Sequence, residues 1–274
     1  MKTWTKRQYL TYILLFALLF VDFSRELFLL IVRDLLDPSI KQIYTPQLRI
    51  LETYLFVFQW LGSFPVMISI LKLNRDRLQE MNIDRFYVFM LVTAGLIPLF
   101  KSPNIFPFNF FAVISFIALI YAVYFLFDNT VKFAIVDRNS FLKTLLIIGT
   151  LAGIIFWING FIDALKISVP NSGQLLDRFL FQIIPGSIYE EAMYRGMLYM
   201  LLMDLGVSKS KAFFIQAFWF SGKHISLLLA SPFFYWIIFP ILGLTFGYIA
   251  MRSKSLTPST LAHILYSTFV LFTR

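Results

Sequence analysis

The sequence predicts an all-α membrane protein, a polytopic transmembrane helical bundle of about eight or nine spans. Three observations support this fold class: 59% of the 274 residues are hydrophobic, 19% are aromatic and only 14% are charged. A soluble domain is about 45–50% apolar and about 25% charged, so the composition is typical of a membrane protein. It excludes a disordered chain and argues against a water-soluble enzyme. Because each span needs about 20 residues, no room remains for a separate soluble domain.

Clusters of charge divide the sequence into apolar runs, and these runs are the predicted spans. They cover residues 9–32, 51–71, 86–100, 108–127, 141–162, 178–203, 212–230, 232–251 and 259–273. The third and the last are short, which suits a partial or tilted helix. The clearest connecting segments are 74–85, 163–177 and 252–259. They collect charge, Pro, Ser or Asn, so we expect them to face water.

An excess of basic residues predicts the orientation of the chain. Lys and Arg number 24 against 15 Asp and Glu, a formal charge of +9. Beside apolar runs this charge favours anionic lipid headgroups, so the expected partner is the lipid bilayer and not nucleic acid. With nine spans and a cytoplasmic N-terminus, 14 basic residues lie on the cytoplasmic side and 6 on the other. This bias predicts a multi-pass protein with its N-terminus in the cytoplasm.

The first span contains three charged residues, Asp22, Arg25 and Glu26. A charge at membrane depth is costly and needs a reason. Helical neighbours of opposite sign pair readily, so we expect an internal ion pair that divides this run into a span and an interfacial helix. Such a pair would have no chemical role.

The sixth run carries two adjacent carboxylates and an arginine, Glu190, Glu191 and Arg195. Glu191 and Arg195 are four residues apart and can form an intrahelical ion pair. Glu190 points about 100° away from Glu191, so it cannot share the arginine equally. A desolvated carboxylate without such a partner is suited to act as a general base or as an acid that shares a proton.

The chain has only two histidines, His224 and His263, and both lie within apolar runs. A single buried histidine is more often structural than functional. Both histidines and both glutamates, however, lie in the last third of the chain at similar depth, where they can converge on a water or a metal in the bundle core. Four glycines are expected to let these helices approach closely: Gly196, Gly222, Gly243 and Gly247.

These residues form three motifs, and through them the sequence resembles the CPBP family, the CAAX prenyl protease and bacteriocin-processing membrane proteins also called the Abi family. Residues 190–195 match the first motif, Glu-Glu-x-x-x-Arg, in full, and residues 220–224 match the second, Phe-x-x-x-His. The third motif, His-x-x-x-Asn, is half matched, because His263 is present but Ser267 replaces the asparagine. The resemblance covers residues 178–270.

The resemblance implies an intramembrane endopeptidase that hydrolyses a peptide bond near the membrane surface with a glutamate-activated water. The implied substrate is a peptide or a lipidated protein. In this family pattern Glu190 is the general base, His224 assists it, and His263 donates to the oxyanion. Glu191 and Arg195 are then expected to hold the helix and to tune the electric field around the base.

Ser267 is the departure from the family pattern. Its hydroxyl can donate one hydrogen bond, but it is shorter than Asn and can turn toward the backbone of its own helix. Loss of one oxyanion donor costs about 10²–10³ in rate. Ser267 is therefore compatible with a slower enzyme, a different oxyanion hole or a member that has lost catalysis.

The sequence predicts one integral membrane unit in two parts. Residues 1–165 are predicted as N-terminal transmembrane helices without a recognised motif, and residues 166–274 as the CPBP-like catalytic helical core. The chain has no cysteine, which excludes disulfides, thiolate metal sites and a cysteine nucleophile.

Three alternatives remain open. The first is a zinc-dependent variant, in which Glu190, His224 and His263 would be ligands of a divalent metal such as zinc. The His-Glu-x-x-His spacing is absent, so we favour the metal-free enzyme and expect no cofactor. The second is a proton or ion pathway, although no inverted repeat supports it. The third is a non-catalytic membrane scaffold or a bacteriocin-immunity protein, which Ser267 would suit.

Overall fold

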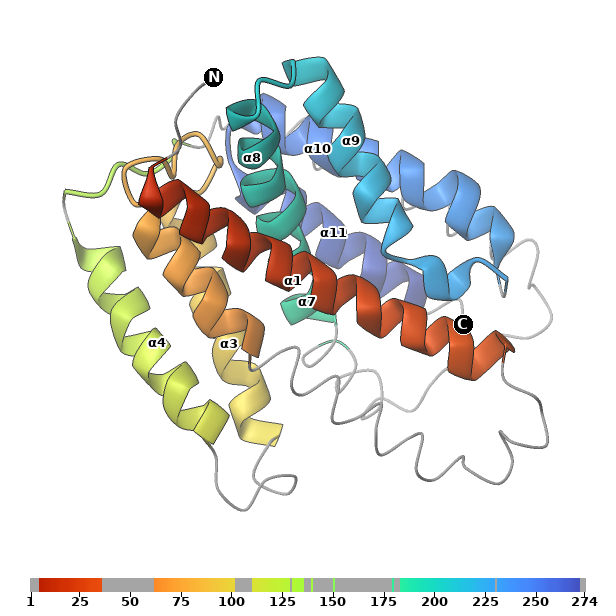
Figure 1. The fold of residues 1–274 in the computed structure, drawn as a ribbon, viewed down its shortest axis with the longest axis horizontal. Coiled ribbons are helices and arrows are strands. Elements are labelled where there is room, and N and C mark those ends of the chain that lie inside the picture. Colours follow the sequence, from red (N-terminus) through yellow and green to blue (C-terminus); the bar gives the residue numbers. More distant parts are fainter. Residues whose placement is uncertain are drawn as a thin grey trace.

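The computed structural model describes residues 5–35, 62–101, 110–128, 130–135, 139, 150, 179, 183–229 and 231–271. These residues form helices joined by turns and contain no strand, which confirms the predicted all-α class (Figure 1). Among them, only the helix Phe234–Ser253 is both long and apolar enough to cross a membrane. The number of spans therefore stays a prediction.

The N-terminal helix α1 (Lys6–Leu30) begins at a capping box formed by Thr5 and Gln8. Each side chain of this pair accepts a hydrogen bond from the backbone N–H of the other, which satisfies two donors at the helix start. The helix continues unbroken through its charged residues into a π-helical turn, Ile31–Leu35. The predicted division of this run into two helices is therefore wrong.

The next described helices are Gly62–Leu73, α3 (Arg85–Lys101) and α4 (Phe110–Phe127). They correspond to the predicted runs 51–71, 86–100 and 108–127, and α3 packs beside α4 (Figure 1). The predicted run 141–162 and the predicted connection 163–177 lie outside the described residues, apart from residue 150.

The C-terminal part forms the helices that carry the motifs. One continuous helix combines α7 (Ile184–Glu190), a π-helical segment (Glu191–Leu198) and α8 (Tyr199–Asp204), as the run 178–203 predicts. The helix α9 (Lys209–Gly222) ends eight residues before the predicted limit at residue 230. There the chain turns at Lys223 and His224 into a short 3₁₀ helix, Ile225–Leu227.

The last two helices match the runs 232–251 and 259–273 to within a few residues. A π-helical turn (Phe234–Ile238) leads into α10 (Phe239–Ser253), and α11 (Leu256–Leu271) follows. Lys254 joins α10 to α11 in the left-handed conformation, with a φ of 52°. Because this reversal is so short, α10 and α11 lie side by side.

Of the connecting segments that we expected to face water, 74–85 is partly buried and 252–259 is largely buried. Asp84 lies in the first of them, and its carboxylate accepts hydrogen bonds from the Tyr87 N–H at 2.9 Å and from the hydroxyls of Ser255 and Thr257 in the second. The Leu256 N–H donates to the Asn82 carbonyl at 2.7 Å. The turn before α3 and the turn before α11 therefore pack on each other, because their polar groups satisfy one another.

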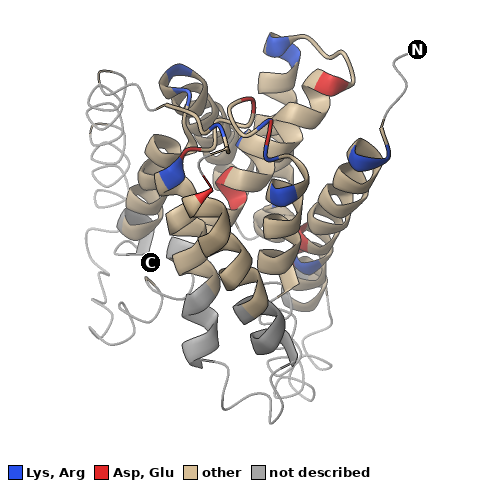
Figure 2. Ribbon diagram, turned by 90° about the vertical axis from the view of Figure 1, so that its left-hand side faces the viewer, with Lys and Arg blue, Asp and Glu red and all other residues tan. Residues whose placement is uncertain are grey.

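Most charged residues of the described chain lie toward the end of the bundle that carries the N-terminus (Figure 2). Arg7 of α1 bonds Asp76 at 2.9 Å, and this hydrogen bond lowers the pKa of the Asp76 carboxyl below its ordinary value. Arg77 bonds both carboxylate oxygens of Asp204 at 2.8 Å, and these hydrogen bonds raise the pKa of the Arg77 guanidinium. The start of α1, the turn before α3 and the end of α8 thus meet at one end.

Candidate active site

The two glutamates lie where their helix changes from α to π geometry. Glu190 is the last residue of α7, and Glu191 begins the π-helical segment, all of whose residues are buried. Segments of π-helix are rare and occur frequently at functional sites. The local geometry therefore marks the same position that the first motif marks.

Glu191 is fully buried, and a cation and an imidazole bind the same oxygen of its carboxylate. Its Oε1 lies 3.3 Å from Nη1 of Arg195 and 3.1 Å from Nδ1 of His263. The predicted intrahelical ion pair is therefore confirmed. The guanidinium of Arg195 also lies over the ring of Phe220, 4.0 Å from its centre. A cation–π contact of this kind helps to hold a buried charge.

The ring of His263, on α11, lies between the two glutamates. It stacks on Phe246 with the ring centres 4.7 Å apart. Its Nδ1 faces Glu191, and its Nε2 lies 3.7 Å from Oε2 of Glu190. Within the described part of the chain, this Oε2 accepts no hydrogen bond. His263 is thus fixed on one side and faces the candidate base on the other.

His224 lies at the turn after α9. Its ring stacks on Phe239 with the centres 4.1 Å apart and meets the edge of Phe220. Its Nε2 has no hydrogen-bond partner among the described residues. A buried imidazole nitrogen in this state is available to a water or a substrate.

A cavity of about 350 Å³ connects these groups. Four of the six predicted site residues line it: Glu190, His224, His263 and Ser267. The other walls are mostly apolar and aromatic: Ile183, Gly186, Ser187, Phe220, Leu227, Phe234, Phe239, Leu242 and Tyr266. Glu191 and Arg195 lie behind these walls and contact the cavity only through His263 and Phe220. A large apolar cavity with a few convergent polar groups is the usual form of a binding site.

Lys223 is a residue of this site that the sequence analysis did not single out. Its Nζ lies 2.5 Å from Oε1 of Glu190, and its side chain is only 5% exposed. The signal was present in the sequence, since a lysine inside an apolar run requires a partner at membrane depth. Periodicity alone could not show that this partner was Glu190.

The charges of α1 also contact the site. Asp22 lies 3.5 Å from Nζ of Lys223 and accepts a hydrogen bond from the Tyr194 hydroxyl at 2.8 Å. Glu26 pairs with Arg25 at 3.2 Å and accepts a hydrogen bond from the Ser226 hydroxyl. The expected ion pair within this run is therefore present between Arg25 and Glu26, and helices distant in the sequence supply further partners for Asp22 and Glu26.

The described residues contain no group of three or more His, Cys, Asp or Glu that could hold a metal ion. Glu190 and Glu191 each face a cation already, Lys223 and Arg195 respectively. A divalent metal beside these oxygens would meet charges of its own sign. The surroundings of Glu190, His224 and His263 therefore do not suit a zinc ion bound by these three residues.

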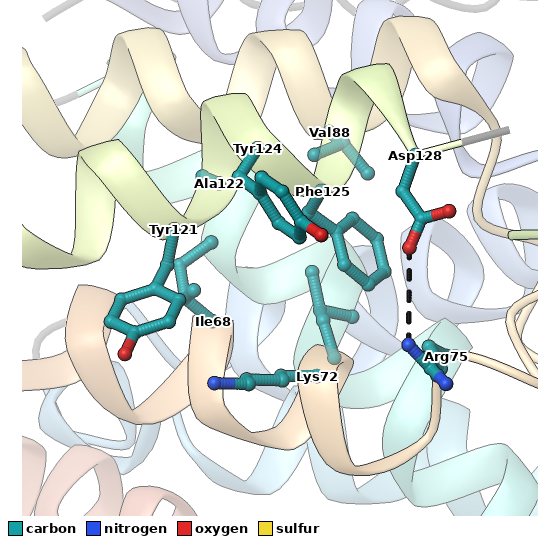
Figure 3. Close-up of a pocket in the computed structure, with 10 residues that line it drawn as sticks. Ile68, Lys72, Arg75, Val88, Tyr121, Ala122, Tyr124, Phe125 and Asp128 are labelled. Atoms are coloured by element: carbon teal, nitrogen blue, oxygen red, sulfur yellow. Dashed lines mark ion pairs between the residues drawn. The ribbon is translucent and has the colours of Figure 1, made fainter. Parts of the chain in front are cut away.

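A second, smaller hollow of about 50 Å³ lies between the helix Gly62–Leu73 and α4 (Figure 3). The Lys72 ammonium lies 4.0 Å from the ring centre of Tyr121, and Arg75 lies 3.8 Å from Asp128 at its rim. The rest of its lining is mainly apolar. Its described lining contains no histidine and a single carboxylate, that of Asp128.

The fold and the site together define a helical protein of membrane-type composition with a buried carboxylate–imidazole centre. Residues 172–269 match the model of the family described as Rce1-like, type II CAAX prenyl endopeptidase Rce1-like. This match confirms the resemblance to the CPBP family that the three motifs indicate. Proteins of this family are embedded in the membrane, which supports a membrane location for this chain. No curated protein and no solved structure matches the chain.

Proposed function

We propose that this protein is an intramembrane endopeptidase of the CAAX prenyl protease-like type, which hydrolyses a peptide bond with a water activated by Glu190. One observation carries the proposal: in the segment that matches the Rce1-like family, His263 lies between two glutamates at the wall of an apolar cavity. Amide hydrolysis needs a base near the attacking water and donors near the carbonyl oxygen. The cavity presents both kinds of group.

In the proposed reaction Oε2 of Glu190 takes a proton from water while the water oxygen bonds to the carbonyl carbon. His224, whose Nε2 lacks a partner in the described chain, orients this water. The carbon–nitrogen bond then breaks, and the proton passes to the leaving amine. The products are a carboxylic acid and an amine, so no further reactant is required.

His263 and Ser267 face the carbonyl oxygen in this mechanism. Glu191 accepts a hydrogen bond from Nδ1 of His263, which fixes the ring and directs Nε2 toward Glu190. A carboxylate orients an imidazole in the same way in other hydrolases. A hydrogen bond donated by an Nε2–H of His263 would then stabilise the developing oxyanion, without transfer of the proton. Arg195 balances the charge of Glu191 throughout.

The substrate that suits this cavity is a peptide or a lipidated protein, because the walls around the polar groups are apolar. We propose a multi-pass protein that inserts in the lipid bilayer with its N-terminus in the cytoplasm. The charged end of the bundle then faces the cytoplasmic headgroups, in agreement with the bias of basic residues (Figure 2).

The test compares purified wild type with Glu190→Gln in detergent, on a quenched fluorescent peptide library that includes farnesylated CAAX peptides. Loss of a general base costs about 10²–10⁴ in rate, so we expect cleavage by the wild type and almost none by the variant. The matched control is Glu80→Gln, an exposed carboxylate outside the cavity. Absence of cleavage by folded wild type would contradict the proposal and favour a non-catalytic role.

A parallel reaction with a chelator tests the metal-free mechanism. We expect cleavage to be unchanged, because Glu190 and Glu191 already pair with cations, Lys223 and Arg195 respectively. Loss of activity that returns when zinc is added would show that the enzyme depends on a metal.

A further inference from the structure

A buried chain of charges links α1 to the candidate base. Lys223 lies between two carboxylates, with its Nζ 2.5 Å from Glu190 and 3.5 Å from Asp22. The hydroxyl of Tyr194 donates to Asp22 at 2.8 Å. Lys223 and Asp22 are both about 95% buried, so bulk solvent screens these contacts much less than contacts at the surface. Asp22 lies outside the three family motifs, and Lys223 occupies a variable position of the second.

A buried carboxylate needs a countercharge to remain ionised, since desolvation favours its neutral form. Among the described residues, the guanidinium of Arg195 forms its close ion pair with Glu191 and not with Glu190. Lys223 is the cation that contacts Glu190 in the described structure. A general base must be ionised before it can take a proton, so this contact bears directly on the proposed reaction.

We propose that Lys223, held by Asp22, is a positioning residue for Glu190. It supplies the charge that keeps the carboxylate ionised, and it binds Oε1 so that Oε2 remains on the side of His263 as the proton acceptor. This inference rests on the proposed function for its kinetic consequences, but the ionisation state of Glu190 is a property of the protein without substrate.

The cavities on either side of Glu190 agree with separate roles for its two carboxylate oxygens. Besides the large cavity, Glu190 lines a separate cavity of about 50 Å³ with Asp22, Arg25, Ser63 and Lys223. This volume is enough for a few waters, and its polar lining offers them partners. Glu190 thus lies between a small cavity on the side of α1 and the larger cavity at His263.

The first experiment measures the ionisation of Glu190 by infrared difference spectroscopy, with each protein compared to its own Glu190→Gln counterpart. In the wild type we expect the band of an ionised carboxylate. In Lys223→Met, which keeps most of the unbranched side chain and removes the charge, we expect the carbonyl band of a protonated carboxyl. An ionised band that persists in Lys223→Met would overturn the inference.

Loss of Lys223 also removes a cation from beside the buried Asp22, which can destabilise that variant. The double variant Asp22→Asn with Lys223→Met removes one charge of each sign and serves as the second variant. We expect its thermal midpoint to return toward that of the wild type, while its Glu190 band is that of a protonated carboxyl. An ionised Glu190 in the double variant would equally contradict the inference.

The second experiment measures kcat and KM on the peptide that the wild type cleaves best. We expect the double variant to lose kcat by on the order of 10²-fold with KM unchanged, because misplacement of a catalytic group has about this effect. Lys223→Arg keeps the charge and should restore most of kcat. If Lys223 only tied α1 to α9, the double variant would recover activity together with its stability, which would overturn the inference.

The two experiments separate the inference from the function on which it rests. Failure of the wild type to cleave any peptide would remove the proposed function, while the infrared comparison would still decide whether Lys223 sets the state of Glu190. Cleavage that is lost in Glu190→Gln but retained in the double variant would keep the function and reject the role of Lys223.

Discussion

Glu190 and Glu191 are neighbours in the sequence and have different surroundings. The helix separates their directions by about 100°, so one turns toward Arg195 and the other toward Lys223. His263 contacts both and is the link between them. Each carboxylate therefore has its own cation and shares one imidazole, which is a reason for two adjacent acids at a single site.

Removal of Arg195 should destabilise the protein, because Glu191 would be left as a buried charge without a cation. Breaking a buried ion pair from one side costs about 3–5 kcal/mol. We expect Arg195→Met to lower the thermal midpoint in detergent, and the double variant with Glu191→Gln to recover a large part of the loss. Equal midpoints for the single and the double variant would argue against this pair as the cause.

Ser267 should contribute as a hydrogen-bond donor if the oxyanion hole is built at this position. It lines the cavity one helical turn beyond His263. We expect Ser267→Ala to lower kcat by up to about 10²-fold, the lower limit for loss of one oxyanion donor. Ser267→Asn, which restores the family residue, should retain or raise kcat. An unchanged kcat in Ser267→Ala would exclude this hydroxyl from the reaction.

At the scale of the elements, two glycines of α10 let this helix cross α9 at close range. A Cβ at Gly243 would lie 2.7 Å from the carbonyl oxygen of Ala217, and one at Gly247 would lie 2.3 Å from the side-chain amide of Gln216. Gly196 is less confined, and a Cβ at Gly222 would meet nothing within 4 Å. The expected close approach is therefore present where Gly243 and Gly247 of α10 meet α9. Gly222, at the end of α9, does not contribute to it.

Gly243→Ala should therefore push α9 and α10 apart. The obstructing atom is backbone and cannot rotate away, and overpacking of this kind costs about 1–3 kcal/mol. We expect a lower thermal midpoint, with Gly222→Ala as the matched control in the same pair of helices. Because Gly222 has space around it, that control should leave the midpoint unchanged or raise it slightly. A midpoint that fell equally in both variants would point to helix propensity or flexibility instead.

At the scale of the whole molecule, four segments meet at the end of the bundle where most of the described charged residues lie (Figure 2). The start of α1 binds the turn before α3, which in turn binds the end of α8 and the turn before α11. Residues from distant parts of the sequence thus gather at one end of the bundle, the end that the proposed orientation assigns to the cytoplasm.

The proposed orientation can be tested by labelling, because the chain has no cysteine of its own. Ser208→Cys lies in the turn between α8 and α9, at the charged end, and Lys101→Cys lies at the far end of α3. In intact cells we expect a membrane-impermeant maleimide to label Lys101→Cys and to label Ser208→Cys only after lysis. The reverse pattern would place the N-terminus outside.

The sequence by itself determined the class of the protein, the approximate limits of most described helices and the residues of the three motifs. These follow from composition, from apolar runs and from spacing along one helix. The pair of Glu191 and Arg195 could be predicted for the same reason, since residues four apart on a helix are neighbours in any tertiary structure.

Only the tertiary structure decided which charges meet. The contacts of Lys223 with Glu190 and Asp22 join three helices, and the early end of α9 that permits them comes from a turn within an apolar run. The burial of the turns around Asp84 likewise depends on hydrogen bonds to Ser255 and Thr257 far along the chain. Periodicity reports the faces of single helices, whereas these contacts depend on how separate helices pack.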